Sequence, residues 1–423
     1  MRATIQPGVI CGTLQAPPSK SSMQRALAMA LLHDDITILH HPGISQDDEA
    51  AKQIIIALGA DITQSMDGSL HIRGGLKKGE TLNIYCGESG LSIRMFTPIA
   101  GITGSVVNIN GSGSLLNRPM DFFMDVLPEL NVRFSSNDGK IPLQVQGPMI
   151  PANIEVDGSL SSQFLTGLLM AIGATATEPV HLQVHGLKSK PYIDLTLAVM
   201  RHFGYNISHQ DHRSFIILPK QPVGPVAYTV EGDWSGAAFL LVAGAISKQV
   251  QVQGLDMQST QADRKIMEAL AHAGATIEHT AKGILITARS LQGFNFDATD
   301  CPDLFPPLVA LAAYCEGKTT IHGVSRLKHK ESDRAATLTS EFSKMGLNIS
   351  HEGDVMTIVG GALNGSVVSS CHDHRIAMAL AVAAVAAKGE TIIEDAEAVR
   401  KSYPRFYEDL MNAGINISFE PKM

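Results

Sequence analysis

Polar and ionisable side chains stand at the start of six strongly apolar segments of this 423-residue chain. The residues at these starts are Ser21, Ser89, Ser161, Ser235, Asp303 and His374. The first turn of a helix leaves backbone N–H groups unpaired and carries the positive end of the helix dipole, so it attracts anions. If several such starts converge, they form an anion site to which acidic and basic side chains can add binding and proton transfer.

Two short segments concentrate the charged groups. Residues 328–334 read KHKESDR, and five of the seven carry formal charge at neutral pH. Such a mixture is also typical of a solvated helix start, with Ser332 as the cap and Asp333 in the first turn. Residues 371–375 read CHDHR and lead directly into a segment predicted to be an apolar helix. Exposure to water alone explains less well why charged residues lie directly before so apolar a segment.

Three further starts have simple structural interpretations when each is taken alone. Lys20 and Arg25 lie about one helical turn apart and suit a phosphate or carboxylate. Residues 161–163 (SSQ) and Asp303 are typical helix caps. Independent caps do not explain why cations, a carboxylate and a histidine recur at matched positions, whereas a shared anion-binding cleft does. The basic residues expected at or near these helix starts are Lys20, Arg25, Arg94, Arg118, Lys330, Arg334, Arg375 and Lys401.

The helix starts belong to a repeat with a period of roughly 70 residues. A second series of helical runs ends in glycine followed by an alternating stretch, at Gly59, Gly204, Gly274, Gly346 and Gly414. The expected sixth copy, near Leu130, lacks the glycine. Each repeat is predicted to form a strand, a helix, a strand, a second helix and two short strands. One such unit cannot bury its apolar face on its own, so the six units must pack around shared cores. We expect two groups of three.

The repeat also predicts the domain organisation. A Pro- and Gly-rich loop at residues 219–225 precedes the expected boundary. Residues 3–14 are predicted to form one strand that packs with the C-terminal half, in the position of a strand that ends a unit elsewhere. One domain is then residues 1–18 plus 230–423 and the other is residues 19–229. The chain crosses twice between them, which is a hinge geometry, and the active site is expected in the interdomain cleft.

Composition excludes several classes of partner. The formal net charge of −8 argues against a nucleic-acid surface. No run is long and apolar enough for a membrane span, and the start of the chain lacks a signal peptide. Five cysteines form no CxxC pair, which fits a reduced compartment. We therefore expect a cytoplasmic monomer that binds small molecules and neither nucleic acid nor membrane.

Motifs along nearly the whole chain resemble those of the 3-phosphoshikimate 1-carboxyvinyltransferases, or 5-enolpyruvylshikimate-3-phosphate (EPSP) synthases, of the enolpyruvyl transferase family. In chain order they are SKSSMQR, SGLSIR, NRPM, SSQF, SKPYID, VEGD, the Pro-Asp pair at Asp303, KESDR, DHR and Lys401 before SYP. The resemblance implies an α/β (α+β) fold of two domains, each built from three βαβαββ repeats as an inside-out α/β barrel. It implies transfer of the enolpyruvyl group of phosphoenolpyruvate to the 5-hydroxyl of shikimate 3-phosphate, by addition and elimination through a tetrahedral adduct. It implies no metal and no organic cofactor.

The resemblance also implies roles for individual residues. Those expected to bind shikimate 3-phosphate are Lys20, Ser21, Arg25, Ser161, Ser162, Gln163, Ser189, Tyr192, Asp303 and Lys330. Those expected to bind phosphoenolpyruvate are Lys20, Gly90, Arg118, Gln163, Arg334, Arg375 and Lys401. Asp303 is expected to take the proton from the 5-hydroxyl, and Glu331 to protonate the methylene carbon with support from His374. Lys20 completes the expected catalytic set.

The chain departs from the family pattern beside Gly90. Glu88 and Leu91 stand where the family usually has Asn and Thr, which bears on substrate affinity and on the response to the herbicide glyphosate. Arg326 stands where some members have a substrate-contacting Asn or Gln, so that role is not carried over.

Three alternatives have different signatures. The UDP-N-acetylglucosamine enolpyruvyl transferases have the same architecture, but usually carry a reactive cysteine before an Arg-Pro pair. Here that stretch reads GSGSLLNRP and has no cysteine. The acidic balance opposes an RNA-end-processing or RNA-binding relative. The third alternative is an inactive relative that serves only as a scaffold. Against it stands the presence of all the expected catalytic and binding residues Lys20, Asp303, Glu331, Arg375 and Lys401.

Overall fold

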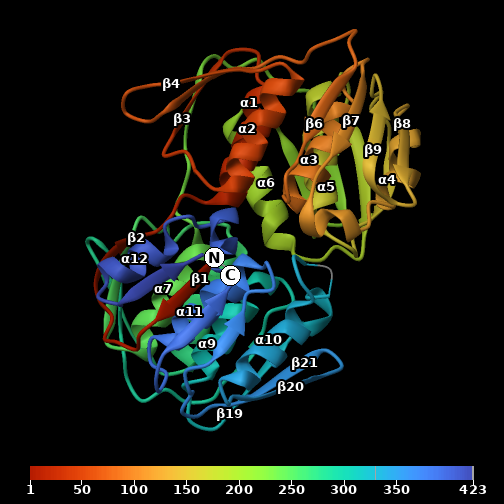
Figure 1. Cartoon of the computed structure of the whole chain (residues 1–423). Coiled ribbons are helices and arrows are strands. Elements are labelled where there is room, and N and C mark those ends of the chain that lie inside the picture. Colours follow the sequence, from red (N-terminus) through yellow and green to blue (C-terminus); the bar gives the residue numbers. More distant parts are fainter. Residues whose placement is uncertain (329, 422–423) are drawn as a thin grey trace. The chain divides into compact units, whose positions relative to one another are not determined.

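The chain folds into two compact units in the computed structural model, which describes residues 1–328 and 330–421. His329, a member of the charged segment 328–334, lies outside the described residues. One unit comprises Met1–Ser19 with Gly232–Met423, and the other comprises Lys20–Glu231. The two predicted junctions lie after residues 18 and 229. Figure 1 follows the chain from red to blue through these elements.

The unit Lys20–Glu231 contains three four-stranded sheets. In sheet order their strands are β14 (Val226–Thr229), β3 (Ile36–His40), β5 (Leu70–Arg73) and β4 (Asp61–Gln64); β6 (Leu82–Tyr85), β7 (Val106–Asn110), β9 (Lys140–Gln146) and β8 (Arg133–Asn137); and β10 (Ile154–Asp157), β11 (Val180–His185), β13 (Ser214–Ile217) and β12 (Ile207–Gln210). The helices are α1 (Lys20–Leu31), α2 (Gln46–Leu58), α3 (Gly90–Ala100), α4 (Phe122–Glu129), α5 (Ser162–Thr175), α6 (Lys190–His202) and the 3₁₀ turn η1 (Gly113–Asn117).

The other unit repeats this plan. Its sheets are β2 (Cys11–Gln15), β15 (Gln249–Gln253), β17 (Gly283–Thr287) and β16 (Thr276–Thr280); β18 (Asn295–Asp297), β19 (Lys318–His322), β21 (Val355–Val359) and β20 (Asn348–Glu352); and β22 (Val367–Ser369), β23 (Thr391–Glu394), β1 (Arg2–Ile5) and β24 (Ile417–Glu420). Its helices are α7 (Trp234–Ile246), α8 (Ile266–His272), α9 (Phe305–Ala312), α10 (Arg334–Lys344), α11 (His374–Ala384) and α12 (Phe406–Asn412). Its 3₁₀ turns are η2 (Ala262–Lys265), η3 (Pro302–Leu304), η4 (Val324–Arg326) and η5 (Ala396–Lys401).

Each sheet combines a parallel pair with an antiparallel pair, as β6–β7 and β8–β9 illustrate. A parallel pair needs a crossover connection, and α3 supplies it between β6 and β7. Three repeats borrow a strand from a distant part of the chain. β14 pairs in parallel with β3, β2 pairs in parallel with β15, and β1 lies between β23 and β24.

The prediction of a single strand over residues 3–14 is wrong. The segment forms β1 and β2, which belong to different sheets, and only β1 takes the position of a strand that ends a unit. Pro7 and Gly8 lie between the two strands. Proline cannot donate a ladder hydrogen bond and Pro-Gly favours a turn, which explains the interruption.

Three helices form the centre of each unit. α3 packs against α1 and α5, while α7, α9 and α11 pack against one another (Figure 1). Every residue of α3, α9 and α11 is buried, as expected for helices that are apolar on all sides. No helix among the described residues has the length and apolarity to cross a bilayer.

The degenerate sixth copy of the helix-ending glycine has a local substitute. Gly59, Gly204 and Gly274 follow their helices with positive φ angles of 134°, 81° and 85°. Asn131, two residues after α4, has φ of 60°. Apart from glycine, asparagine is among the residues that best tolerate this left-handed conformation. The chain can therefore reverse here without a glycine.

Candidate functional site

The starts of the core helices converge in the unit Lys20–Glu231. The side-chain oxygen of Gln24 on α1 accepts hydrogen bonds from Ser89 Oγ and Ser92 Oγ, at 3.1 and 3.0 Å, at the start of α3. Arg94 Nη1 on α3 donates to Gln163 Oε1, at 2.9 Å, at the start of α5. The first turns of α1, α3 and α5 therefore lie next to one another, and their unpaired N–H groups share one region.

Two of the serines singled out by the sequence also cap helices. Ser89 Oγ accepts from Ser92 N and caps α3, and Ser161 Oγ accepts from Gln163 N and caps α5. The structural interpretation of residues 161–163 is therefore confirmed for Ser161. Ser162 is buried in the first turn of α5, and Ser189 precedes α6 with a positive φ of 55° and no side-chain cap bond.

Arg25 is a buried cation that links the starts of α1 and α6. Its guanidinium donates to Thr196 Oγ1 at 2.9 Å, to the Ser21 carbonyl at 2.8 Å and to the Tyr192 carbonyl at 3.3 Å. These acceptors are uncharged. Burial lowers the pKa of Arg25 to about 10, so it stays protonated at neutral pH. A desolvated cation held by neutral oxygens is suited to an incoming anion.

Lys20 lies at the first position of α1 and forms an ion pair with Asp47, with Nζ 2.8 Å from Oδ2. Only 14% of the Lys20 side chain and 5% of the Asp47 side chain are exposed. The pair therefore holds the lysine at the helix start, where an anion with access to it would compete with the carboxylate.

Arg118 lies directly over the start of α3. A Cβ atom placed on Gly90 would be 2.2 Å from Arg118 Nη1 and 3.5 Å from Arg94 Nη1. Two guanidinium groups against a helix N-terminus repel its positive end unless an anion lies among them. Arg118 reaches this place from the end of η1, four residues before α4 begins, so it lies near one helix start in the sequence and beside another in space.

A second cluster forms in the other unit, around Asp303. Lys330 Nζ lies 3.0 Å from Asp303 Oδ1, Arg334 Nη1 lies 2.8 Å from the same oxygen, and Arg375 Nη2 lies 3.2 Å from Oδ2. Asp303 forms part of η3 and has no capping bond of its own, so its interpretation as a helix cap is wrong. Three cations on one carboxylate indicate a site for anions rather than a cap.

Glu331 is the second carboxylate of this cluster. Its Oε2 lies 2.6 Å from Arg334 Nη2, and its Oε1 lies 4.0 Å from Lys401 Nζ. Lys401 comes from the end of η5 rather than from a helix start. The two carboxylates thus share Arg334 and have different second partners.

Arg334 is held by Asp373, a residue to which the sequence analysis assigned no role. Arg334 Nε lies 2.8 Å from Asp373 Oδ2, and the two side chains are 1% and 0% exposed. Burial alone would lower the pKa of Arg334, but Asp373, Glu331 and Asp303 raise it above its ordinary value.

Asp373 also organises the adjacent helix starts. It caps α11 by accepting from the Arg375 N–H at 3.0 Å, and it accepts from Ser332 Oγ at 3.1 Å. Asp333, not Ser332, caps α10, so that part of the sequence interpretation is wrong. His374 is buried beside this network, with Nδ1 3.8 Å from Asp373 Oδ1.

The charges around Asp303 set its protonation state. Burial alone would raise the pKa of Asp303, but Arg375, Lys330 and Arg334 hold it well below its ordinary value. Burial lowers the pKa of Lys330, and the charge of Asp303 opposes this shift. Asp303 is therefore ionised at neutral pH, and any anion that draws these cations away makes it a stronger base.

Sequence reasoning missed Asp263 on η2. Burial and the charge of Asp303 raise the pKa of Asp263 to about 7, and Ser235 Oγ donates a hydrogen bond to it. The repeat contains a pattern that could have identified this residue. Asp48 precedes Gly59 by the same number of residues as Asp263 precedes Gly274, and burial raises the pKa of Asp48 to about 6.

Comparison with known proteins decides the family. The family model described as EPSP synthase (3-phosphoshikimate 1-carboxyvinyltransferase) matches residues 5–410. The chain belongs to the EPSP synthase family. The 3-phosphoshikimate 1-carboxyvinyltransferase of Clostridium kluyveri is 36% identical over 416 residues, covering 97% of each chain. That of Methanosarcina mazei is 35% identical over 433 residues and covers all of both chains.

Solved structures agree with this assignment. EPSP synthase from Acinetobacter baumannii is 26% identical, has a TM-score of 0.83 and covers 99% of this chain and 100% of its own. The enolpyruvyl transferase NikO from Streptomyces tendae is 17% identical, has a TM-score of 0.77 and covers 99% of this chain and 98% of its own, which speaks to the fold alone. The predicted fold class, a two-domain enolpyruvyl transferase fold, and the resemblance to EPSP synthases are confirmed.

The residues expected from EPSP synthases fall into two sets, one in each unit. Lys20, Ser21, Arg25, Gly90, Arg118, Ser161, Ser162, Gln163, Ser189 and Tyr192 lie in the unit Lys20–Glu231. Asp303, Lys330, Glu331, Arg334, His374, Arg375 and Lys401 lie in the other unit. The structure also locates the two residues that depart from the family pattern. The carboxylate of Glu88 packs against Gly113 in the turn that leads to Arg118, and Leu91 is buried.

Proposed function

We propose that these two sets together form the active site for the EPSP synthase reaction. The family assignment makes the chain an enzyme of the shikimate pathway to chorismate and the aromatic amino acids. It transfers the enolpyruvyl group of phosphoenolpyruvate to the 5-hydroxyl of shikimate 3-phosphate and releases phosphate. The observation that carries the proposed roles is the convergence of Lys330, Arg334 and Arg375 on Asp303.

The first role of these residues is to neutralise two acidic substrates. Phosphoenolpyruvate and shikimate 3-phosphate each carry a phosphate and a carboxylate, which repel one another in a shared site. We assign Arg118, Arg334, Arg375 and Lys401, with Gly90 at the start of α3, to phosphoenolpyruvate. We assign Arg25, Ser21, Ser161, Ser162, Ser189, Tyr192 and Lys330 to shikimate 3-phosphate. Lys20 and Gln163 are assigned to both. Cations fixed before the substrates arrive require little reorganisation during the reaction.

Substrate binding also prepares the base. Phosphoenolpyruvate competes with Asp303 for Arg334 and Arg375, which hold that carboxylate in the free chain. As these cations turn to the substrate, the pKa of Asp303 rises toward its ordinary value. Asp303 can then take the proton of the 5-hydroxyl as its oxygen attacks C2 of phosphoenolpyruvate.

Glu331 supplies the second proton transfer. Two negative substrates draw Arg334 and Lys401 away from Glu331, which favours its protonated form. It then protonates the methylene carbon of phosphoenolpyruvate and yields a tetrahedral adduct. Loss of phosphate from C2 and return of a proton from the new methyl group to the Glu331 carboxylate then restore the double bond. His374, buried beside Asp373, supports the position of this network.

A phosphate-release assay tests the proposed function. Release is expected only when phosphoenolpyruvate and shikimate 3-phosphate are both present. The family match and the relatives favour this acceptor over UDP-N-acetylglucosamine, which serves as the alternative acceptor in the same assay. Release with UDP-N-acetylglucosamine and none with shikimate 3-phosphate would overturn the assignment.

We also propose that the two sets meet in a cleft between domains formed by residues 19–229 and by residues 1–18 with 230–423. The stretches that join the units support a hinge. Pro18 forms an isolated bridge with Gly232, and Asp233 N donates to the Pro17 carbonyl at 2.7 Å. Shikimate 3-phosphate alone is then expected to reduce the radius of gyration in small-angle X-ray scattering. An unchanged radius at saturation would argue against hinge closure.

The chain is further proposed to act as a monomer in the cytoplasm. The net charge of −8 supports solubility without a partner, and the absence of paired cysteine motifs fits a reducing compartment. Sedimentation velocity of the purified chain is expected to give a single species of monomer mass, and a stable dimer would refute the first half of this proposal.

A further inference from the structure

Two histidines and one aspartate form a cluster on α6 and the β12–β13 hairpin, and none of the three is assigned to the reaction. Asp194, His209 and His212 each offer one ligand atom, and these atoms all lie within 4.8 Å of one another. His212 Nε2 lies 2.6 Å from Asp194 Oδ1. The rings of His209 and His212 have centroids 4.1 Å apart and planes inclined by 33°. We propose that these three residues bind a divalent transition-metal ion of the zinc type.

The donor set and spacing suit such an ion. Imidazole nitrogen and carboxylate oxygen both bind Zn²⁺ at about 2.0–2.2 Å, so neighbouring ligands of a tetrahedral site lie roughly 3.3 Å apart. The observed separations, from 2.6 Å to no more than 4.8 Å, bracket that value. Three protein ligands leave a fourth position open for water or an anion.

Two of the three ligands already contact one another. The 2.6 Å contact of His212 with Asp194 is a hydrogen bond, and a metal ion that replaces its proton uses the same two atoms. An imidazole that binds a metal ion through one ring nitrogen carries its proton on the other.

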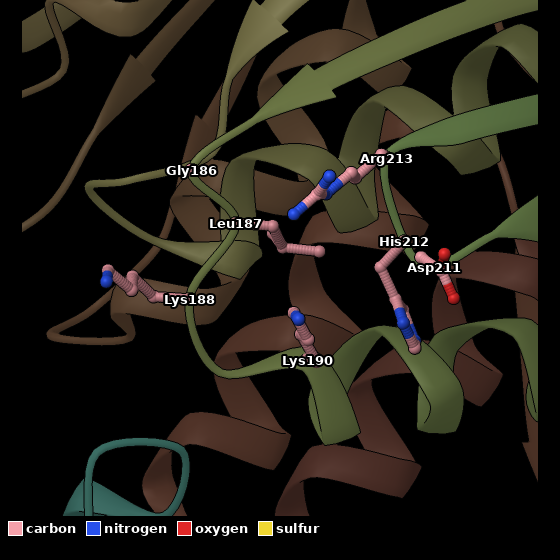
Figure 2. A pocket seen from close by; sticks show the side chains of 7 residues that line it. All are labelled: Gly186, Leu187, Lys188, Lys190, Asp211, His212 and Arg213. Atoms are coloured by element: carbon pink, nitrogen blue, oxygen red, sulfur yellow. The ribbon is translucent and has the colours of Figure 1, made fainter.

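The surroundings indicate an open site rather than a closed structural one. His212 also lines a cavity of about 170 Å³ with Gly186, Leu187, Lys188, Lys190, Asp211 and Arg213. Figure 2 shows the His212 side chain directed toward α6, while Arg213 reaches toward Leu187 on the other side of the cavity. The cations of this cavity favour an anion in the fourth coordination position, and they weaken the affinity relative to a site with acidic neighbours.

The bound ion would act on stability rather than on the chemistry of the reaction. It would tie the β12–β13 hairpin to α6 at Asp194, near the first turn, where the Tyr192 carbonyl accepts a hydrogen bond from Arg25. A ligand that binds only the folded chain raises the unfolding temperature. We therefore expect zinc to stabilise the chain without being required for phosphate release.

Calorimetric titration with Zn²⁺ tests this site in the full-length, untagged chain stripped with a chelator. Cys11 and Cys371 are exposed thiols that also bind zinc, so both are changed to serine in the background. We expect one ion per chain and a higher unfolding temperature with zinc. His209→Ala, His212→Ala and Asp194→Asn should each weaken binding at least about tenfold, since even second-layer changes around a metal often do so.

A matched control and a second probe make the outcome decisive. His185 forms an exposed pair with Glu155 on the same sheet, at 3.2 Å, so His185→Ala removes a histidine without touching the cluster. It should leave binding unchanged. Co²⁺ in place of Zn²⁺ should show visible absorption that the three cluster variants lose, with their folding checked by circular dichroism. No saturable binding in the background chain, or equal binding in the cluster variants and the control, would overturn the proposal.

Discussion

Replacing Gly90 with alanine tests whether Arg118 must lie over the start of α3. A Cβ atom at this position would be 2.2 Å from Arg118 Nη1. Non-bonded atoms of this size prefer separations of about 3.5 Å, so the guanidinium has to move by roughly 1.3 Å. Because Nη1 is the end of a flexible side chain, the backbone can stay in place. We expect the free energy of unfolding to change by less than about 0.5 kcal/mol.

The substitution should mainly impair the use of phosphoenolpyruvate. A displacement of about 1 Å in a positioning group can reduce the rate by about 10²-fold. We therefore expect kcat/KM for phosphoenolpyruvate to fall by about 10- to 100-fold, which is about 1.4–2.7 kcal/mol of transition-state stabilisation. The KM for shikimate 3-phosphate should change much less, since Gly90 and Arg118 are assigned to the other substrate. Phosphate release, with each substrate varied at saturating levels of the other, separates the two effects.

A double-mutant cycle shows whether the effect passes through Arg118. If alanine at position 90 acts only by moving this guanidinium, then Gly90→Ala combined with Arg118→Ala should lose no more activity than Arg118→Ala alone. Additive losses, or a Gly90→Ala enzyme that uses phosphoenolpyruvate as well as the wild type, would refute the reasoning.

Three further outcomes are expected. Asp303→Ala and Glu331→Ala should each reduce turnover by about 10²–10⁴-fold with little loss of folding, and wild-type phosphate release in both would remove the acid–base assignment. Asp373→Asn should lower the free energy of unfolding by about 3 kcal/mol, because it breaks a buried ion pair. The matched control Glu408→Gln breaks an exposed pair and should cost under about 1 kcal/mol in the same urea titration. The raised pKa of Asp263, about 7, means that the folded chain keeps a proton that the unfolded chain releases. Wild-type stability relative to Asp263→Asn should therefore fall as pH rises from about 4 to about 7 and then level off, and parallel stability curves would contradict this.

The starts of the core helices were predictable because they depend on local chemistry. Ser89 and Ser161 cap α3 and α5 at the positions where the apolar segments begin. A polar side chain that satisfies a free N–H group, followed by a run of apolar residues, specifies a helix start with little help from the rest of the fold. The same local logic assigned the cap of α10 to Ser332 instead of Asp333, an error of one residue.

The strand arrangement at the N-terminus was not predictable from periodicity. β1 and β2 are too short to differ in pattern from one longer strand, and their partners lie far away, among residues 249–253 and 391–420. The energy that separates the two arrangements comes from those distant ladders. The local sequence pattern therefore indicated extended structure, but it could not show that the segment forms two strands rather than one.

The charge network was predictable in its members but not in its geometry. The motifs named Asp303, Glu331 and Arg334, yet Asp303 in isolation looked like a helix cap. Only the fold shows that the segment before α10, the first residue of α10 and the first turn of α11 bring three cations to this carboxylate on η3. Asp373 and Asp263 were missed because a buried carboxylate and a capping one have the same sequence signature, and burial by distant segments separates them.

A crystal structure of the chain with shikimate 3-phosphate and phosphoenolpyruvate, or a stable analogue of the latter, tests the central claim most directly. We predict that Arg25 and Tyr192 contact the first ligand while Arg118, Arg334 and Arg375 contact the second, with Asp303 beside the 5-hydroxyl. Ligands held by residues of one unit only, or an Asp303 that keeps all three of its cations with both substrates bound, would contradict it.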